Sequence, residues 1–258
     1  MLQTSSILPR KGILNHLRHQ QSLIDCLETY EQRVRMSKTK WLQKKKSKAF
    51  KASFQGIEKT LKMLALGSSN YCNYCESNVG SSIEHIFPRG LFPHKTFSWD
   101  NLLWACNQCN GVHKHAQFQI FTSENSAKTL DLLKDYSFIQ PPNDDAVFIN
   151  PRTEDPLKYL QLNLSTGHYE PLSEDRESRG YKKAYYTLQT LRLNQRKGLL
   201  AERIRSIAQF GALLRQKGLT KEQLQLYIVD MKHPTIAKEI ARQRSHPLAT
   251  KAINLQLL

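Results

Sequence analysis

The spacing of apolar side chains in the first quarter of the chain predicts helices. Leucine and isoleucine recur every three or four positions among polar residues, the period at which one face of an α-helix meets a core. The residues concerned are Leu14, Leu17, Ile24 and Leu27, followed by Ile57, Leu61, Leu64 and Ala65. The polar run Gly67-Ser68-Ser69-Asn70 then ends this helical region.

The rest of the chain changes character twice. Residues 71–115 combine short apolar pieces with paired cysteines, whereas residues 121–175 are rich in Pro, Gly, Asn and Asp. Within the second stretch we expect two short strands, at 146–149 and 160–164. Helical spacing returns between Arg179 and Lys217.

A last helix is expected after residue 220. Thr220-Lys221-Glu222-Gln223 fits a capping box, apolar side chains follow at helical spacing, and His233-Pro234 would end the helix. We therefore expect an α+β fold that is mainly α, with a small module set between helical flanks. The expected regions are a basic helical region 1–66, the module 67–120, and a region 121–258 that is irregular to about 175 and then helical.

Charge and hydropathy narrow the class of protein. The 258 residues contain 38 Lys and Arg against 22 Asp and Glu, a formal charge of +16. Seven lysines, among them Lys44, Lys45 and Lys46, fall between Lys38 and Lys51 without an acid. An excess of this kind favours nucleic acid as partner; an anionic membrane and a merely solvated face are the alternatives. No apolar run approaches a membrane span and no secretion signal is evident, so we expect a cytoplasmic protein with no membrane partner.

Four of the five cysteines form two matched pairs. Cys72 and Cys75 have the Cys-x-x-Cys spacing, as do Cys106 and Cys109, and 30 residues separate the pairs. Two such knuckles supply four thiolates for a tetrahedral Zn²⁺, and in a protein without an export signal this is favoured over disulfides or a redox dithiol. We therefore expect a structural zinc ion. Cys26 stands alone on an apolar helix face and is expected in the core.

Polar residues with catalytic chemistry lie between and just after the cysteine pairs. Glu84 and His85 are adjacent, Asn101 follows the apolar segment after them, and Asn110 comes directly after Cys109. Each of these residues alone carries little information. Arranged in this order around a zinc frame, they resemble the HNH (ββα-metal) nuclease motif, in the subset whose hairpin is held by four cysteines.

The HNH resemblance implies a role for each residue. Strands at 83–87 and 102–105 and a helix from about Asn110 would form the ββα-metal core. Glu84 and Asn110 would hold a catalytic Mg²⁺ or Mn²⁺, because carboxylate and amide oxygens suit a hard cation and leave positions open for water and phosphate. His85 would be the general base, and Asn101 would support it through backbone hydrogen bonds. The phosphate contacts would be Arg89, His113 and Lys114, and the family's usual lysine corresponds to His113 or Lys114.

A longer resemblance points to a smaller group. Residues 71–76, 83–89 and 99–103 resemble the PtuB-like HNH subunit of bacterial anti-phage systems of the Septu and retron-associated kind, and 149–156 and 191–194 fit less closely. The resemblance implies cleavage of DNA or tRNA alongside a partner ATPase. The chain itself has no Gly-x-x-x-x-Gly-Lys-Ser/Thr loop.

The sequence thus leaves three functions open. A metal-dependent endonuclease is the leading hypothesis. The first alternative is a zinc-ribbon module that binds nucleic acid without catalysis. The second is an interaction subunit whose basic segment 38–51 docks on an acidic surface.

Overall fold

The computed structural model describes most of the chain. The described residues are 1, 4, 7–43, 48–66, 70–77, 79–123, 126–130, 138–215, 235, 236, 238, 239 and 242. Lys44, Lys45 and Lys46 and the helix expected after Thr220 lie outside them. Within the described ranges the protein combines helices with three two-stranded antiparallel sheets, so the expectation of an α+β fold is confirmed.

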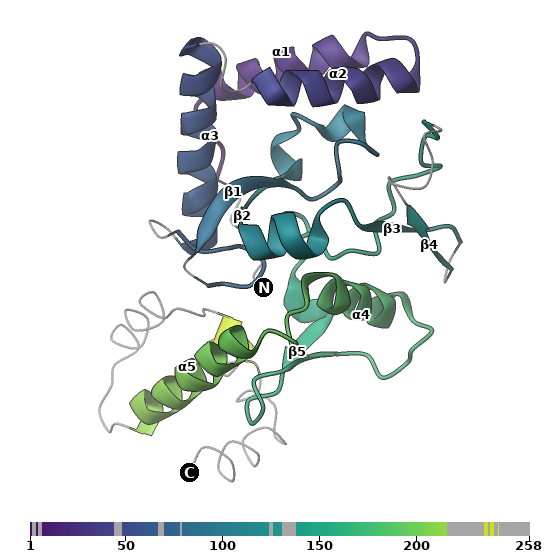
Figure 1. Cartoon of the computed structure of the whole chain (residues 1–258). Coiled ribbons are helices and arrows are strands. Elements are labelled where there is room, and N and C mark those ends of the chain that lie inside the picture. The colour runs from purple at the N-terminus through teal and green to yellow at the C-terminus, as the bar shows by residue number, and fades with distance from the viewer. Residues whose placement is uncertain are drawn as a thin grey trace.

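Three helices pack together in the N-terminal region. They are α1 (Lys11–Asp25), α2 (Tyr30–Leu42) and α3 (Lys48–Leu66) (Figure 1). The first residues of α2 are fixed by a capping box, in which the Gln32 amide donates to Thr29 Oγ1 and the Thr29 amide donates to Gln32 Oε1. Cys26 follows α1 and is exposed, so the expectation that it lies in the core is wrong.

A hairpin at the centre of the molecule joins the two halves. Strand β1 (Gly80–His85) pairs antiparallel with β2 (Leu102–Cys106), with Gly80 opposite Cys106 and His85 opposite Leu102. All five residues of β2 are buried. Leu102 and Trp104 pack with the N-terminal helices, whereas Leu103 and Ala105 pack into the C-terminal half. An uninterrupted apolar strand is what burial on both faces requires.

The elements after the hairpin form the second half of the molecule. In chain order they are the π-helix η4 (Gln108–Lys114), β3 (Phe118–Phe121) paired with β4 (Ala127–Leu130), β5 (Leu160–Leu162) paired with β6 (Tyr169–Pro171), α4 (Arg179–Leu191) and α5 (Lys197–Arg215). Short 3₁₀ turns cover Pro93–Lys95 (η2), Trp99–Asn101 (η3) and Pro156–Lys158 (η5). In Figure 1, α4 and α5 lie on the side of the hairpin away from α1 and α2.

The structure corrects three expectations of secondary structure. Residues 146–149 form no strand; Ala146 makes a single bridge to Ile120. The β3–β4 hairpin was not expected, because its apolar run is only four residues long. The helix expected over 179–217 breaks at Arg192, which adopts a left-handed conformation with φ 50°.

The break after α4 is held from outside the helix. Asn194 accepts a hydrogen bond from the Tyr169 amide at 2.9 Å and donates to the Tyr169 carbonyl, which joins the turn to β6.

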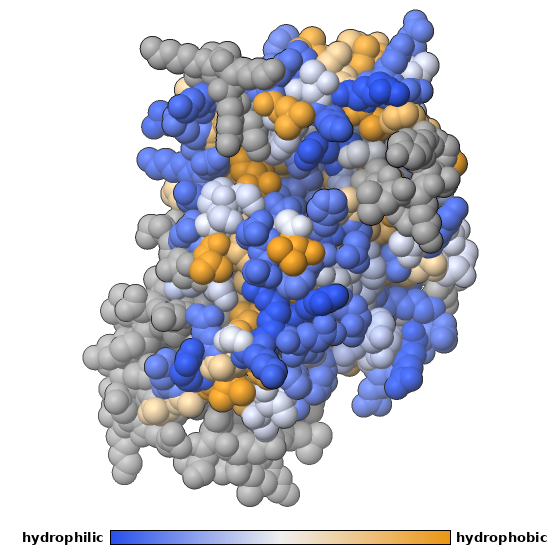
Figure 2. Space-filling view, viewed as in Figure 1, coloured by the Kyte–Doolittle hydropathy of each residue, from blue (hydrophilic) through white to orange (hydrophobic). Residues whose placement is uncertain are grey.

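Among the described residues, no helix is both long and apolar enough to cross a membrane. On the face seen in Figure 2, apolar side chains form small separate spots within a hydrophilic surface.

Candidate active site and metal centre

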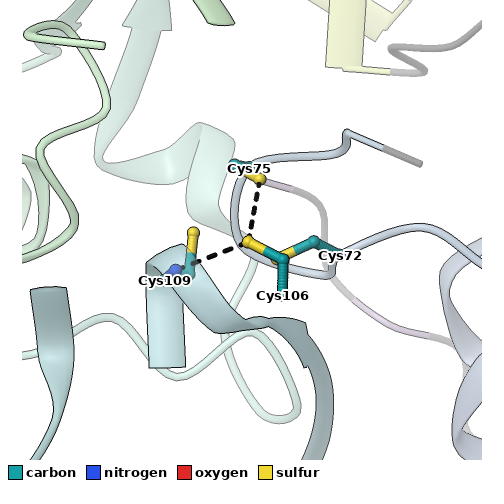
Figure 3. A group of neighbouring side chains, drawn as sticks. All are labelled: Cys72, Cys75, Cys106 and Cys109. Carbon is teal, nitrogen blue, oxygen red and sulfur yellow. Dashed lines mark hydrogen bonds between the residues drawn. The ribbon is translucent and has the colours of Figure 1, made fainter. Parts of the chain in front are cut away.

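The four paired cysteines converge at one end of the β1–β2 hairpin. Cys72 and Cys75 lie in a turn before β1, Cys106 ends β2, and Cys109 lies in the first turn of η4 (Figure 3). The four sulfur atoms lie within 4.8 Å of one another, and all four residues are buried. The Cys75 and Cys106 sulfurs are 3.8 Å apart. Zn–S bonds of about 2.3 Å give a tetrahedron with edges of about 3.8 Å, so the cluster fits a Zn²⁺ ion.

The electrostatics of the cluster also favour a bound cation. Hydrogen bonds from the other three cysteines hold the pKa of Cys106 well below its ordinary value, whereas burial raises the pKa of Cys72. The Cys109 amide donates to the Cys106 sulfur, and Arg196 Nη1 lies 3.2 Å from the Cys109 sulfur. Hydrogen bonds from the other cysteines raise the pKa of Cys109, so the thiolate form, which binds zinc, is favoured at Cys106 and not at every cysteine.

A second cluster of polar residues surrounds the other end of the hairpin. Glu84 is buried in β1, and burial raises the pKa of its carboxyl group, an effect that the Lys114 ammonium opposes. Lys114 Nζ lies 2.5 Å from Glu84 Oε1 and donates to the His85 carbonyl at 3.0 Å. The end of η4 is therefore bound to β1 by a buried ion pair.

The ring of His85 is held between two contacts. Its Nε2 lies 2.9 Å from the Thr96 carbonyl oxygen, and the Trp41 ring packs edge-on at 4.2 Å between ring centroids. A carbonyl oxygen can only accept a hydrogen bond, so this contact assigns the proton to Nε2. In the neutral ring, Nδ1 is then the nitrogen able to accept a proton.

Asn101 fixes the loop that follows β1. Its Oδ1 accepts from the Phe87 amide at 2.7 Å, and its Nδ2 donates to the carbonyl groups of Phe87 and Lys95 at 3.0 and 2.9 Å. The Asn101 carbonyl also accepts from the Ile86 amide at 3.0 Å. These hydrogen bonds therefore fix the path of the backbone directly after His85.

Asn110 connects η4 to the same strand. Its Nδ2 donates to Ser82 Oγ at 2.9 Å and to the Ile83 carbonyl at 3.4 Å. The π-helix is closed by a bond from the His115 amide to the Asn110 carbonyl, and π-helical turns of this kind occur often at functional sites. With its nitrogen bound to β1, Asn110 retains Oδ1 as the atom that a hard cation would use.

Glu84, His85 and Asn110 line one pocket of about 560 Å³. Helix α2 forms the opposite wall, with Val34, Ser37 and Lys38, and Arg89 and His115 also contribute. A carboxylate and an amide oxygen in one pocket match the ligands that Mg²⁺ or Mn²⁺ prefers, so the residues present fit a divalent ion. The wall from α2 was not expected, because contacts such as that between Ser37 and Arg89, 52 residues apart, leave no local pattern in the sequence.

The three residues expected to contact phosphate differ in burial and in position. Arg89 is half-buried and lines the pocket, and its carbonyl accepts from Ser37 Oγ at 3.3 Å. His113 is half-buried on η4. Lys114 is fully buried, so the expectation that it contacts a phosphate is corrected: its ammonium is used by Glu84 and His85 instead.

Comparison with known proteins gives one partial similarity. No family model matches the chain. The chain is similar to the Septu protein PtuB of Bacillus mycoides (strain KBAB4), with 30% identity over an alignment of 125 residues. The alignment covers 42% of the present chain and 39% of the Bacillus protein, so the similarity concerns part of each. This similarity agrees with the resemblance of the sequence to PtuB-like proteins. It supports a relation to a Septu protein, which is a less specific statement than the presence of a nuclease motif.

Proposed function

We propose that the protein is a metal-dependent endonuclease of the HNH type. Strands β1 and β2 and the helix η4 would form its ββα-metal core. The observation that carries the proposal is the pocket itself: an acid and an imidazole from β1 and a carboxamide from η4 line one cavity, at the end of the hairpin away from the cysteine cluster.

The chemistry of the pocket suits hydrolysis of a phosphodiester bond. Glu84 and Asn110 would hold a Mg²⁺ or Mn²⁺ ion, which supplies stabilisation of negative charge on the phosphate and on the leaving 3′ oxygen. His85 accepts a proton from the attacking water at Nδ1, because Nε2 is engaged by Thr96. A bond forms between the water oxygen and phosphorus, the bond to the leaving 3′ oxygen breaks, and that oxygen takes up a proton from solvent water.

Basic side chains at the pocket favour a phosphate-bearing substrate. Lys38 from α2 and Arg89 after β1 both line it, and His115 lies at the end of η4. Together with the formal charge of +16, they support nucleic acid as the substrate. The cysteine cluster would bind Zn²⁺ and hold the first residues of η4 against β2, a structural role.

The similarity to a Septu protein supports a defence function. We infer that this nuclease is the effector of a bacterial anti-phage system, cleaves DNA or tRNA in the cytoplasm, and acts with an ATPase partner. Because the alignment covers 39% of the Bacillus protein, the substrate and partner are inferences for this chain and are tested separately from the chemistry.

One observation favours a second candidate function. The carboxylate of Glu84 already has a cationic partner in Lys114, which a site without any divalent ion would also show. The second candidate is therefore a zinc-ribbon module that binds nucleic acid without cleaving it. It predicts a single bound Zn²⁺ and no second metal.

The test is cleavage by the full chain and by a His85→Ala variant. Plasmid, single-stranded DNA and tRNA are incubated with each protein in Mg²⁺ or Mn²⁺, with and without the proteins encoded beside it. Loss of the general base lowers the cleavage rate by about 10²–10⁴-fold. His19→Ala, on the exposed face of α1, is the matched control and retains the parent rate. Equal rates for the parent and His85→Ala would contradict the proposal.

A further inference from the structure

Lys114, which pairs with Glu84, is buried to an unusual degree for a lysine. Lysine is almost never fully buried unless it is paired. Here the relative exposure of the side chain is 0% for Lys114 and 3% for its partner Glu84. Other lysine pairs in the described residues lie nearer the surface; for Lys182 and Glu177 the values are 23% and 82%.

The position of the Lys114 ammonium is defined by three neighbours. It lies against the Glu84 carboxylate, donates a hydrogen bond to the His85 carbonyl at 3.0 Å, and is 5.7 Å from the centre of the Phe148 ring. All three neighbours are negative or electron-rich, as the surroundings of a bound cation would be. The carboxylate that the proposed function assigns to a divalent ion therefore already has a positive group on one oxygen.

Two cations cannot share this carboxylate without cost. Like charges a few ångströms apart in a partly buried site repel strongly, by amounts that change a binding constant more than tenfold. A divalent ion that reaches Glu84 must either displace the ammonium or bind beside it. In both cases the presence of Lys114 makes the net free energy of metal binding less favourable.

We propose that Lys114 occupies the cation position at Glu84 in the metal-free protein and lowers the affinity of the pocket for its divalent ion. The proposal rests on the proposed function, because it concerns the same carboxylate. It adds a regulatory property: the buried Glu84 carboxylate stays paired with a cation when no metal is bound, and loading requires a high concentration of the ion. A purely structural role for the ion pair would predict no change in metal affinity on removal of Lys114.

The experiment compares Mn²⁺ binding to the zinc-loaded full chain and to Lys114→Met. Isothermal titration calorimetry gives the dissociation constant, and melting curves with and without Mn²⁺ give an independent measure. We expect the dissociation constant to fall at least tenfold in Lys114→Met, and its melting temperature to rise more on addition of Mn²⁺ than that of the parent. Lys182→Met, which breaks the ion pair between α4 and Glu177, is the matched control and binds Mn²⁺ as the parent does.

Two further variants keep the result interpretable. Lys114→Gln retains a donor for the His85 carbonyl and serves where Lys114→Met does not fold. The double variant Glu84→Gln with Lys114→Met restores neutrality and is expected to bind no Mn²⁺ at this site. Equal or weaker binding by the Lys114 variants than by the parent would overturn the inference alone. Absence of any Mn²⁺ binding by the parent and by both Lys114 variants would overturn the proposed function with it.

Discussion

The cysteine cluster and the Glu84 pocket lie at opposite ends of one hairpin and differ in how they hold charge. At the Gly80–Cys106 end, four identical ligands converge, all of them buried, which fills the coordination shell of a tetrahedral ion. At the His85–Leu102 end, one carboxylate, one imidazole and one amide face a pocket, and a lysine supplies the compensating charge.

Under the proposed function, the difference separates a stabilising site from a reactive one. A closed cluster offers no position to a substrate, so its metal can only contribute to folding. A pocket with few ligands and a replaceable cation leaves room for water and phosphate. Changes at the cysteine end are therefore expected to act on stability, and changes at the pocket end on metal binding and cleavage.

The largest effect on stability is expected from Cys109→Ser. Loss of one thiolate would abolish the proposed zinc site; in small zinc modules the energy of zinc binding contributes about 10 kcal/mol to folding. We expect the variant to contain no zinc by elemental analysis and to lose protection from hydrogen exchange in β2 and η4. Cys26→Ser, at the exposed cysteine, is the control and keeps both properties. A zinc-loaded, stable Cys109→Ser would remove the distinction between the two ends.

Asn101→Ala is expected to have an effect of intermediate size, and to lower both stability and cleavage. It leaves the buried Phe87 amide and two carbonyl groups without their partner, at a cost of about 3 kcal/mol in the free energy of unfolding. Because the loop positions His85, cleavage should fall as well. Urea denaturation and the nuclease assay measure the two effects. Asn143→Ala, which loses a more exposed pair of bonds, should cost less and leave cleavage unchanged.

The smallest effect is expected from Arg196→Met. The guanidinium at 3.2 Å from the Cys109 sulfur partly offsets the negative charge of four thiolates, and its loss should cost about 1–3 kcal/mol. We expect faster release of zinc to a chelator, followed with a colorimetric indicator. Lys197→Met removes a neighbouring exposed charge and should release zinc at the parent rate. Identical release by Arg196→Met would show that this arginine does not support the cluster.

The cysteine cluster could be predicted from the sequence because its geometry is mostly local. A Cys-x-x-Cys pair already places two sulfurs in one turn, and the predicted strands bring the two pairs together. The hairpin was also close to expectation, with β1 and β2 within three residues of the predicted limits. The order of Glu84, His85, Asn101 and Asn110 along the chain was enough to suggest one site.

Other features depend on contacts that the sequence does not show. The burial of Lys114 follows from the wide turn of a π-helix, which α-helical periodicity cannot reveal. The contact of Trp41 with the His85 ring, and the position of Ser37 and Lys38 in the pocket lining, arise from the packing of α2 on the hairpin. The break at Arg192 depends on Asn194 binding Tyr169, a contact across 25 residues.

The alternating burial of β2 has a consequence for how the protein melts. Its side chains belong by turns to the cluster of the N-terminal helices and to the cluster of the C-terminal half. Neither half can come apart without exposing one face of the same strand to water. Heating is therefore expected to unfold the two clusters together in calorimetry rather than in two separate steps.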